Sequence, residues 1–402
     1  MMHPSYMPQR VRSTKSRPRN PGSQGALRQQ NQQRIVESLL TGGPSTQAEL
    51  ARNTGLSTAT VSNIVKDMAE NGLVDTSPVT SSGRRALSVR LLDSGSVAVG
   101  VDFGRRHVRV VITSLGYEVR AEEALTMPLG YAAEEGLIVG AELLDRLLDE
   151  NGIERSSVLG VGIGIPGPID RRTNTVVVGA ILPEWVGVDI TDLERRFEFP
   201  VIIDNDANFG ALGEVTWGEN RGVRNLIFVK IGSGIGSGLI LNGAPYGGHL
   251  GITGEIGHSP VSDHGLICRC GNRGCLETVA STSIMIELLG RGSSEPITTA
   301  DIVRRGLERD PATLRVLDDA GTAVGRAIAN MANMINPEVV LIGGPLAALG
   351  DIILDPVKRG LVRNALPIIG ETTAIRMSSL GDRAEALGAA ALVLQQPGVH
   401  PR

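Results

Sequence analysis

The sequence contains few cysteines and no long apolar run. Three cysteines among 402 residues are too few, and odd in number, for a secreted disulfide framework, so reduced thiols or a metal site are favoured. No stretch reaches the ~20 uninterrupted apolar residues of a membrane-spanning helix, and no apolar segment follows the basic N-terminal residues. We therefore expect a soluble, bacterial-type cytoplasmic protein with no membrane partner.

Acidic residues are scarce at the N-terminal end, although the net charge of the whole chain is -4. Residues 1–92 contain 12 Lys or Arg and 5 Asp or Glu, whereas residues 93–402 contain 27 and 38. Such asymmetry is typical of a protein in which one module binds a polyanion. Residues 1–27, rich in Pro, Ser, Arg and Gly, are expected to be a disordered basic tail, either merely solvated or contacting DNA.

Residues 28–92 have the pattern of a winged helix-turn-helix. A first helix is expected to end near Gly42, and the next segment predicts two short helices around a glycine turn at Gly55. Thr46 or Ser45 can cap the first of these helices and Ser57 the second. The second helix has a periodic apolar stripe, formed by Val61, Ile64, Val65 and Met68.

The opposite face of the second helix carries short polar side chains and one cation, as expected for a helix that enters the major groove of DNA. These candidate DNA contacts are Thr58, Thr60, Ser62, Asn63 and Lys66. Two strands with a Ser/Gly-rich loop follow, and Arg84 and Arg85 near the loop tip are placed to contact phosphates or the minor groove. An ordinary helical hairpin is the alternative, and the local basic charge favours DNA binding.

From Ser96 onward, β-branched runs that end in Gly or Asp alternate with helical stretches. This alternation predicts an α/β architecture with largely parallel sheets. Two Gly-rich strand pairs, at 100–112 and 227–241, suggest two similar halves with a cleft between them.

Glycine-rich and acidic segments at the predicted strand ends supply candidate ligand contacts. In the segment 232–238 the backbone N–H groups can cradle phosphate, although glycine also suits any tight hairpin. The candidate residues there are Gly232, Ser233, Gly234 and Gly236. Asp102, beside Gly104, can hold hydrated Mg²⁺. In the segment DNDAN at 204–208, Asp206 is the candidate general base for a substrate hydroxyl, and local turn hydrogen bonds are the alternative role.

All three cysteines lie within eight residues. Cys268, Cys270 and Cys275, together with His258, supply the four ligands that a closed tetrahedral zinc site takes. Glycines at 271 and 274 allow the chain to fold back so that the three sulfurs face one point. His264 competes with His258 on position alone, and a redox-active cysteine pair is the alternative interpretation of the cluster.

The order of these motifs resembles the ROK family of sugar kinases and sugar-responsive repressors. The motifs are D-x-G (102–104), G-x-G-x-P-G-P-I-D (162–170), D-N-D-A-N (204–208), G-S-G-I-G-S-G (232–238), G-E-I-G-H (254–258), C-x-C-G-x-x-G-C-x-E (268–277) and L-I-G-G-P (341–345). The resemblance covers about residues 95–396. The preceding helix-turn-helix resembles the DNA-binding domain of the repressor branch.

This resemblance implies an actin-like, two-lobed ATPase-type fold. Residues 95–205 and 382–396 would form a smaller α/β lobe, and residues 206–381 a larger one with the zinc site. The implied sugar contacts are Asn205, Asp206, Glu255, His258 and Glu277. The implied ligands of a structural zinc ion are His258, in preference to His264, and the three cysteines.

The resemblance also implies a function: a sugar-responsive transcriptional regulator, in the first place a repressor of carbohydrate genes. Its implied partners are a palindromic DNA operator, a sugar or sugar-phosphate effector, and a second copy of the chain in a homodimer or homotetramer. The alternative is a sugar kinase that uses Mg²⁺ and ATP, with Asp206 as the base. The resemblance implies that a kinase of this family has the sequence D-x-G-G-T in its first phosphate loop. This chain instead has Arg105 and Arg106 after Gly104, which argues against ATP binding.

Overall fold

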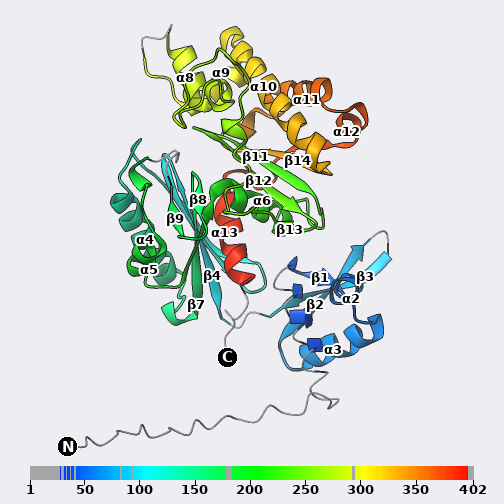
Figure 1. The fold of residues 1–402 in the computed structure, drawn as a ribbon. Helices are drawn as coiled ribbons and strands as arrows, with labels where there is room; N and C mark the ends of the chain where they lie inside the picture. Colours follow the sequence, from blue (N-terminus) through cyan, green and yellow to red (C-terminus); the bar gives the residue numbers. More distant parts are fainter. Residues whose placement is uncertain are drawn as a thin grey trace, which may run out of the picture.

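The computed structural model of the chain describes residues 42–81, 84–92, 95–177, 183–291 and 295–396, with positions 28, 31, 32, 34–36, 38 and 39. The predicted tail, residues 1–27, lies outside the described residues. A winged helix-turn-helix is followed by two α/β lobes (Figure 1), which confirms the predicted fold class. Within the described ranges, no helix has the length and apolar character needed to cross a membrane.

The winged helix-turn-helix contains a small antiparallel sheet and two helices that are described in full, preceded by described positions between 28 and 42 that are also helical. The helices are α2 (Gln47–Thr54) and α3 (Thr58–Glu70), and the strands are β1 (Ser45–Thr46), β2 (Val74–Ser81) and β3 (Arg84–Leu91), in the order β1-β3-β2. Thr46, rather than Ser45, caps α2, in a capping box with Glu49. Gly55 has φ 69° between the helices, and the Ser57 side chain caps α3.

The core of this module comes from the predicted stripe. Val61, Ile64, Val65 and Met68 of α3 are all buried, and they pack with Ile35, Leu39, Leu50, Val74 and Val89. Because one face of α3 is used for packing, its opposite face is left to the solvent.

Each α/β lobe contains a five-stranded sheet of the same topology. The first lobe has β4 (Val97–Gly104), β5 (His107–Ser114), β6 (Val119–Thr126), β7 (Val158–Ile165) and β10 (Val201–Asn205), in the order β10-β7-β4-β5-β6. The second has β11 (Leu226–Ile231), β12 (Ile235–Leu241), β13 (Ala244–Pro245), β14 (Val339–Gly343) and β15 (Ala374–Met377), in the order β13-β12-β11-β14-β15. The first three strands of each sheet form a meander, so the two halves are similar, as predicted.

The prediction of largely parallel sheets is wrong for both lobes. In each sheet the first three strands pair antiparallel, and only the last two join in parallel. Short turns connect the first three strands, and a short turn can join only antiparallel neighbours.

Helices cover the outer faces of the two sheets (Figure 1). In the first lobe these are α4 (Ala133–Glu150) and α5 (Ile190–Phe197), and this lobe also contains the short pair β8 (Ile169–Asp170) and β9 (Thr175–Val176). The helices of the second lobe are α7 (Glu277–Ala280), α8 (Thr282–Gly290), α9 (Thr299–Leu307), α10 (Pro311–Ile335), α11 (Asp351–Asn364) and α12 (Pro367–Thr372).

Two further helices, α6 (Asp206–Thr216) and α13 (Ala384–Leu394), lie between the sheets (Figure 1). They approach so closely that a Cβ atom on Gly388 would lie 1.7 Å from the Phe209 carbonyl oxygen, and one on Gly213 would lie 2.3 Å from that of Ala384. Each helix also lies directly on one sheet. A Cβ atom at Gly162 of β7 would meet the backbone of α13, and a Cβ atom at Gly238 of β12 would meet the backbone of α6. The two lobes are therefore joined through this helix pair.

We expect G388A to lower the free energy of unfolding by about 3 kcal/mol, because the added methyl group forces α13 away from α6. Gly290, at the end of α8, has no atom within 4 Å of a Cβ position, so G290A should change stability by less than about 1 kcal/mol. Urea denaturation of the two variants tests this contrast, and equal stabilities would contradict it.

Candidate functional site

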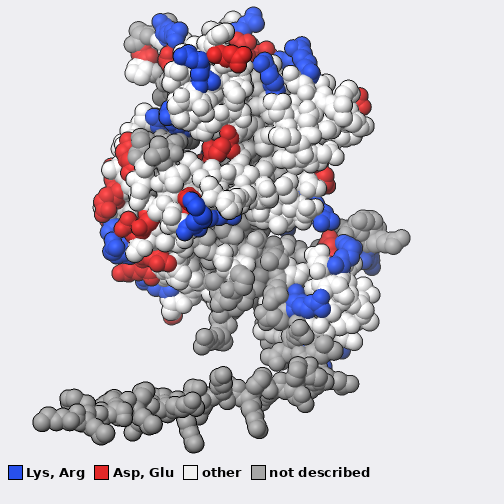
Figure 2. Space-filling view, in the orientation of Figure 1, with Lys and Arg blue, Asp and Glu red and all other residues white. Residues whose placement is uncertain are grey.

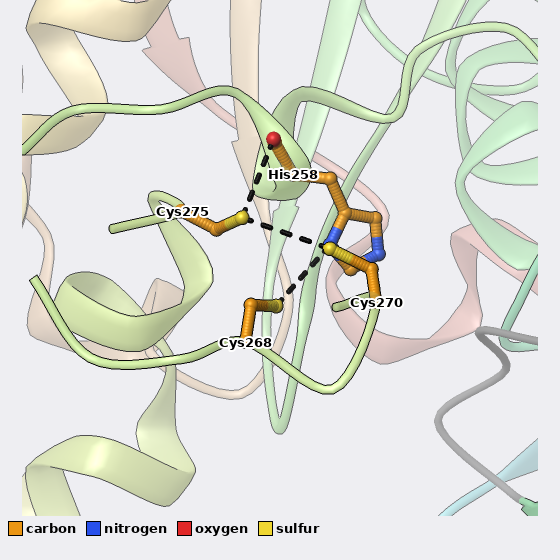
Figure 3. A group of neighbouring side chains, drawn as sticks. All are labelled: His258, Cys268, Cys270 and Cys275. Carbon is orange, nitrogen blue, oxygen red and sulfur yellow. Dashed lines mark hydrogen bonds between the residues drawn. The ribbon is translucent and has the colours of Figure 1, made fainter. Parts of the chain in front are cut away.

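Four side chains converge in the second lobe, as the sequence predicted for a metal site (Figure 3). The ligand atoms of His258, Cys268, Cys270 and Cys275 all lie within 4.8 Å of one another. His264 is exposed and not part of this group, so the structure favours His258 of the two histidines.

The distances in the cluster fit a zinc ion. His258 Nδ1 lies 3.5 Å from Cys268 Sγ, and Cys270 Sγ lies 3.7 Å from Cys275 Sγ. Tetrahedral ligands at zinc bond lengths are separated by about 3.5–3.8 Å, and three thiolates with one imidazole are a common structural zinc set. Positive φ angles of 91° at Gly271 and 66° at Gly274 allow the loop to fold back. The arrangement supports a structural zinc site.

The segment before the cluster is held against β12 by two glycines. A Cβ atom at Gly254 would lie 1.8 Å from the Ser237 carbonyl oxygen, and one at Gly257 would lie 2.1 Å from that of Ile235. This close approach places Glu255 and His258 together, with 3.8 Å between Glu255 Oε2 and His258 Nε2. The ring of His258 thus turns Nδ1 toward the cysteines and Nε2 toward Glu255.

Glu255 lies within electrostatic reach of the two other carboxyl groups predicted to contact a sugar, those of Asp206 and Glu277. Burial raises the pKa of Glu255 to about 7, and the negative charges of Asp206 and Glu277 contribute to that rise. Glu277, the first residue of α7, accepts hydrogen bonds from Arg269 Nη2 at 2.7 Å and from the Ile235 amide at 3.3 Å. Glu277 therefore links the cysteine loop to β12.

Asn205 and Asp206 stand where β10 ends and α6 begins. The Asn205 side chain caps α6 by accepting from the Ala207 amide at 2.8 Å, and it donates to the Gly167 carbonyl at 2.9 Å. Asp206 Oδ2 lies 2.9 Å from Lys230 Nζ, which also lies 2.9 Å from Glu385 Oε1 of α13. The local turn contacts that were the alternative role of this segment are thus present, and the Asp206 side chain is buried.

Sequence reasoning missed Lys230 and Glu385. Each has a signal in hindsight: Lys230 is a cation within the apolar strand LIFVKI, and Glu385 is an acid within the apolar helix AEALGAAALVL. A charge in an otherwise buried segment requires a partner. Their partnership could not be found from sequence because it depends on how α13 packs against β11.

The candidate phosphate loop is covered by side chains of the chain itself. His107 pairs with Gly104 across the β4–β5 hairpin, and its ring occupies the space of a Gly104 Cβ atom, with Cε1 only 2.1 Å away. His107 Nε2 also lies 2.7 Å from Asp102 Oδ2. Burial acts to raise the pKa of Asp102, but Lys230 and His107 outweigh it and hold that pKa below its ordinary value.

An arginine of the first lobe reaches the glycine-rich turn of the second. Arg105 Nη1 donates to Ser283 Oγ at 3.2 Å, and Ser283 Oγ donates to the Ser233 carbonyl at 3.0 Å. Gly232 and Gly234 close the turn by a backbone hydrogen bond of 2.9 Å, and Gly236 follows as the second residue of β12. The Arg105 guanidinium and the Gly232 amide are thus both hydrogen-bonded to groups of the chain itself.

The predicted DNA-contacting face of α3 is largely open to solvent. Thr58, Ser62, Asn63 and Lys66 are exposed, whereas Thr60 is half-buried with its hydroxyl 2.8 Å from Ser57 Oγ. Of the wing arginines, Arg85 is exposed, and the Arg84 side chain lies outside the described part of the chain. Figure 2 shows Lys and Arg side chains on this module.

The DNA-binding module packs on the first lobe next to α6. Tyr117 of the β5–β6 turn and Leu394 of α13 are buried in a cluster with Val36 and Leu91 of the module. The ring of Trp217, the residue that ends α6, lies 5.2 Å from that of Tyr117, and its Nε1 donates to the Tyr117 carbonyl at 2.8 Å. Arg90 of β3 forms ion pairs with Asp75 and with Glu118. Helix α6 thus begins at Asp206, and its other end lies next to the DNA-binding module.

Comparisons with known proteins agree with this geometry. The ROK family model matches residues 98–396, and the MarR family model matches residues 29–85. The xylose repressor of Caldicellulosiruptor bescii is 29% identical over 93% of this chain and 97% of its own. The glucokinase of Halalkalibacterium halodurans is 33% identical over 74% of this chain and 95% of its own.

A solved structure shows the same fold over nearly the whole chain. It is that of a ROK family transcriptional regulator described as a homologue of the Escherichia coli MLC protein, with a TM-score of 0.71 at 24% identity, and the match covers 92% of this chain and 97% of the other. The family model covers most of the chain, and its range, residues 98–396, includes the candidate effector and metal sites. The chain therefore belongs to the ROK family and carries an N-terminal winged helix-turn-helix of the MarR type.

Proposed function

We propose that this protein is a sugar-responsive transcriptional repressor of carbohydrate-utilisation genes. The observation that carries the proposal is the position of α6, which runs from the carboxyl cluster at Asp206 to the joint with the DNA-binding module at Trp217. The full-length similarity to a protein named xylose repressor supports the same assignment. As a homodimer or homotetramer, the protein would present two recognition helices about one helical turn apart on a palindromic operator in the cytoplasm.

The effector is a sugar or sugar phosphate that contacts Asn205, Asp206, Glu255, His258 and Glu277. Carboxylates, an amide and an imidazole provide the donors and acceptors that bind the hydroxyl groups of a polyol. A site built on such hydrogen bonds rejects analogues that lack a hydroxyl, because its own polar groups are then left unpaired.

The phosphate loop favours a regulator over the alternative, a Mg²⁺- and ATP-dependent sugar kinase. Gly104 is followed by Arg105 and Arg106 instead of the glycine and threonine expected of a family kinase, and in the structure the His107 ring lies over Gly104 while Arg105 donates to Ser283. A coupled assay of ADP release across common hexoses should show no turnover above background.

Operator binding and its response to sugar test the proposal directly. The purified protein should retard DNA from its own promoter region, and one of D-xylose, D-glucose or N-acetyl-D-glucosamine should change that affinity by about 5- to 150-fold. The same sugar at 100 times its Kd should stabilise the fold by about 2.7 kcal/mol. A protein that binds no such DNA at low salt, with or without these sugars, would contradict the proposal.

Two substitutions in α3 should weaken DNA binding in different ways. N63A should weaken operator binding by about 1–3 kcal/mol and relax specificity, because an amide reads base edges, while leaving binding to unrelated DNA unchanged. K66A should weaken binding to all sequences alike and reduce the salt dependence by about one unit of slope, because a phosphate contact releases counterions. Titrations of operator and scrambled DNA over a range of salt concentrations distinguish the two.

We expect C270S to lose zinc and to weaken sugar binding about 10- to 100-fold, because the loop that carries His258 and Arg269 is no longer held in place. Its affinity for operator DNA without sugar should stay within about 3-fold, since the module has its own core. His264 lies outside the cluster, so H264A should keep both zinc and sugar affinity. Equal loss of sugar and DNA binding, or full sugar affinity without zinc, would refute this role.

W217F tests whether α6 couples the candidate effector site to the DNA-binding module. The substitution removes the hydrogen bond to the Tyr117 carbonyl but keeps an aromatic ring, so sugar affinity should change little. The effect of sugar on operator affinity should fall about 5-fold or more, because coupling requires that the joint respond to α6. Trp185, whose ring is buried in the first lobe away from the joint, provides the matched control W185F, which should retain the full response.

A further inference from the structure

Lys230 occupies an unusual position in β11. Side chains alternate along a strand, so Leu226, Phe228 and Lys230 project from the same face of the sheet. Leu226 and Phe228 pack in an apolar cluster with Ala207 and Ala211 of α6 and with Ala384 of α13. Lys230 is therefore a cation at the end of an apolar row, directed at the same two helices.

The two helices supply its partners. Lys230 Nζ lies 2.9 Å from Asp206 Oδ2 and 2.9 Å from Glu385 Oε1, and the three side chains are 17%, 9% and 3% exposed. Burial acts to lower the pKa of the amine, but Asp206 and Glu385 outweigh it and hold that pKa well above its ordinary value, so the group remains an ammonium. One cation thus joins strand β11 to both central helices.

The two carboxylate oxygens of Asp206 have different partners. Oδ2 faces the ammonium, while Oδ1 lies 2.9 Å from the Ala207 amide at the start of α6. A carboxylate held on both sides keeps one rotamer, which a free carboxylate near other acids would not. The charge also matters, because Glu255 lies close enough for its carboxylate and that of Asp206 to repel each other, and the Lys230 ammonium offsets that repulsion at Asp206.

We propose that Lys230 is a positioning residue of the effector site, whose ammonium, anchored by Glu385, fixes the Asp206 carboxylate for hydrogen bonding to a sugar hydroxyl. This inference rests on the proposed sugar-binding function and assigns to Lys230 a role in affinity and in selection of the hydroxyl that Asp206 contacts. The alternative is that Lys230 only neutralises buried acids. In that case its removal would affect stability but not the discrimination between sugars.

A double-mutant cycle separates these roles. K230M keeps most of the side-chain volume but removes the charge, D206N removes the charge of its partner, and K230M/D206N removes both and leaves the net charge unchanged. The affinity of each variant is measured by calorimetry for whichever of D-xylose, D-glucose and N-acetyl-D-glucosamine binds the wild-type protein, and for deoxy analogues of that sugar.

We expect K230M and D206N each to weaken sugar binding by about 30- to 100-fold, the loss expected for a buried hydrogen bond to a charged group. The double variant should bind within about 2-fold of D206N, because Lys230 acts through Asp206 and neighbouring residues are not additive. K230M and D206N should lose discrimination against the same deoxy analogue. Sugar affinity of K230M equal to wild type, or losses that add in full in the double variant, would overturn the proposal.

A substitute variant and the affinities of the wild-type protein complete the test. If K230M alone does not fold, K230M/E385Q, in which one buried acid is neutralised with the cation, takes its place in the cycle, and wild-type affinity of that variant would overturn the proposal. If the wild-type protein binds operator DNA but neither these sugars nor their phosphate esters, the proposed effector class fails and this inference fails with it. If the wild type binds a sugar and K230M binds it equally well, only the inference about Lys230 fails.

Discussion

The close packing of α6 against α13 is the constraint on which the rest of the molecule depends. The backbones approach so closely at Gly388 and Gly213 that no side chain fits between them. Each helix also lies on the sheet of one lobe, so this contact fixes how the two lobes face each other. Such packing tolerates no added volume, and it transmits displacement because interiors have low compressibility.

The candidate effector site is built on the ends of these same helices. Asp206 begins α6, Glu385 lies in the first turn of α13, and Lys230 binds both from the sheet of the second lobe. The cluster of His258 and the three cysteines, the candidate zinc site, includes one of the remaining polar groups, and Arg269 of its loop binds another, Glu277. The opposite end of α6 adjoins the DNA-binding module through Trp217 and Tyr117. A sugar that changes the position of α6 would therefore act on the joint without a separate relay.

Much of the molecule could be predicted because its causes are local in sequence. The helix caps at Thr46 and Ser57, the glycine turn at Gly55 and the apolar stripe of α3 each depend on neighbours within a few residues, and the structure has all of them. The cysteine cluster is also local, although position alone did not distinguish His258 from His264; the family resemblance favoured His258, and the folded loop places it in the cluster. The prediction of largely parallel sheets failed because the apolar runs alone do not specify strand direction, which is decided by the length of each connection.

The sequence by itself thus determined the modules, their order and the residue types of each candidate site, because propensity, periodicity and motif spacing act over short stretches of chain. Tertiary structure alone decided the partners of Lys230 and Glu385, the bridge between Arg105 and Ser283, and the placement of Tyr117 on Trp217. Lys230 and Asp206 are 24 residues apart, whereas Arg105 and Ser283 are 178 apart and Tyr117 and Trp217 are 100 apart. Their contacts exist only once the two sheets enclose α6 and α13, and no local pattern encodes that enclosure.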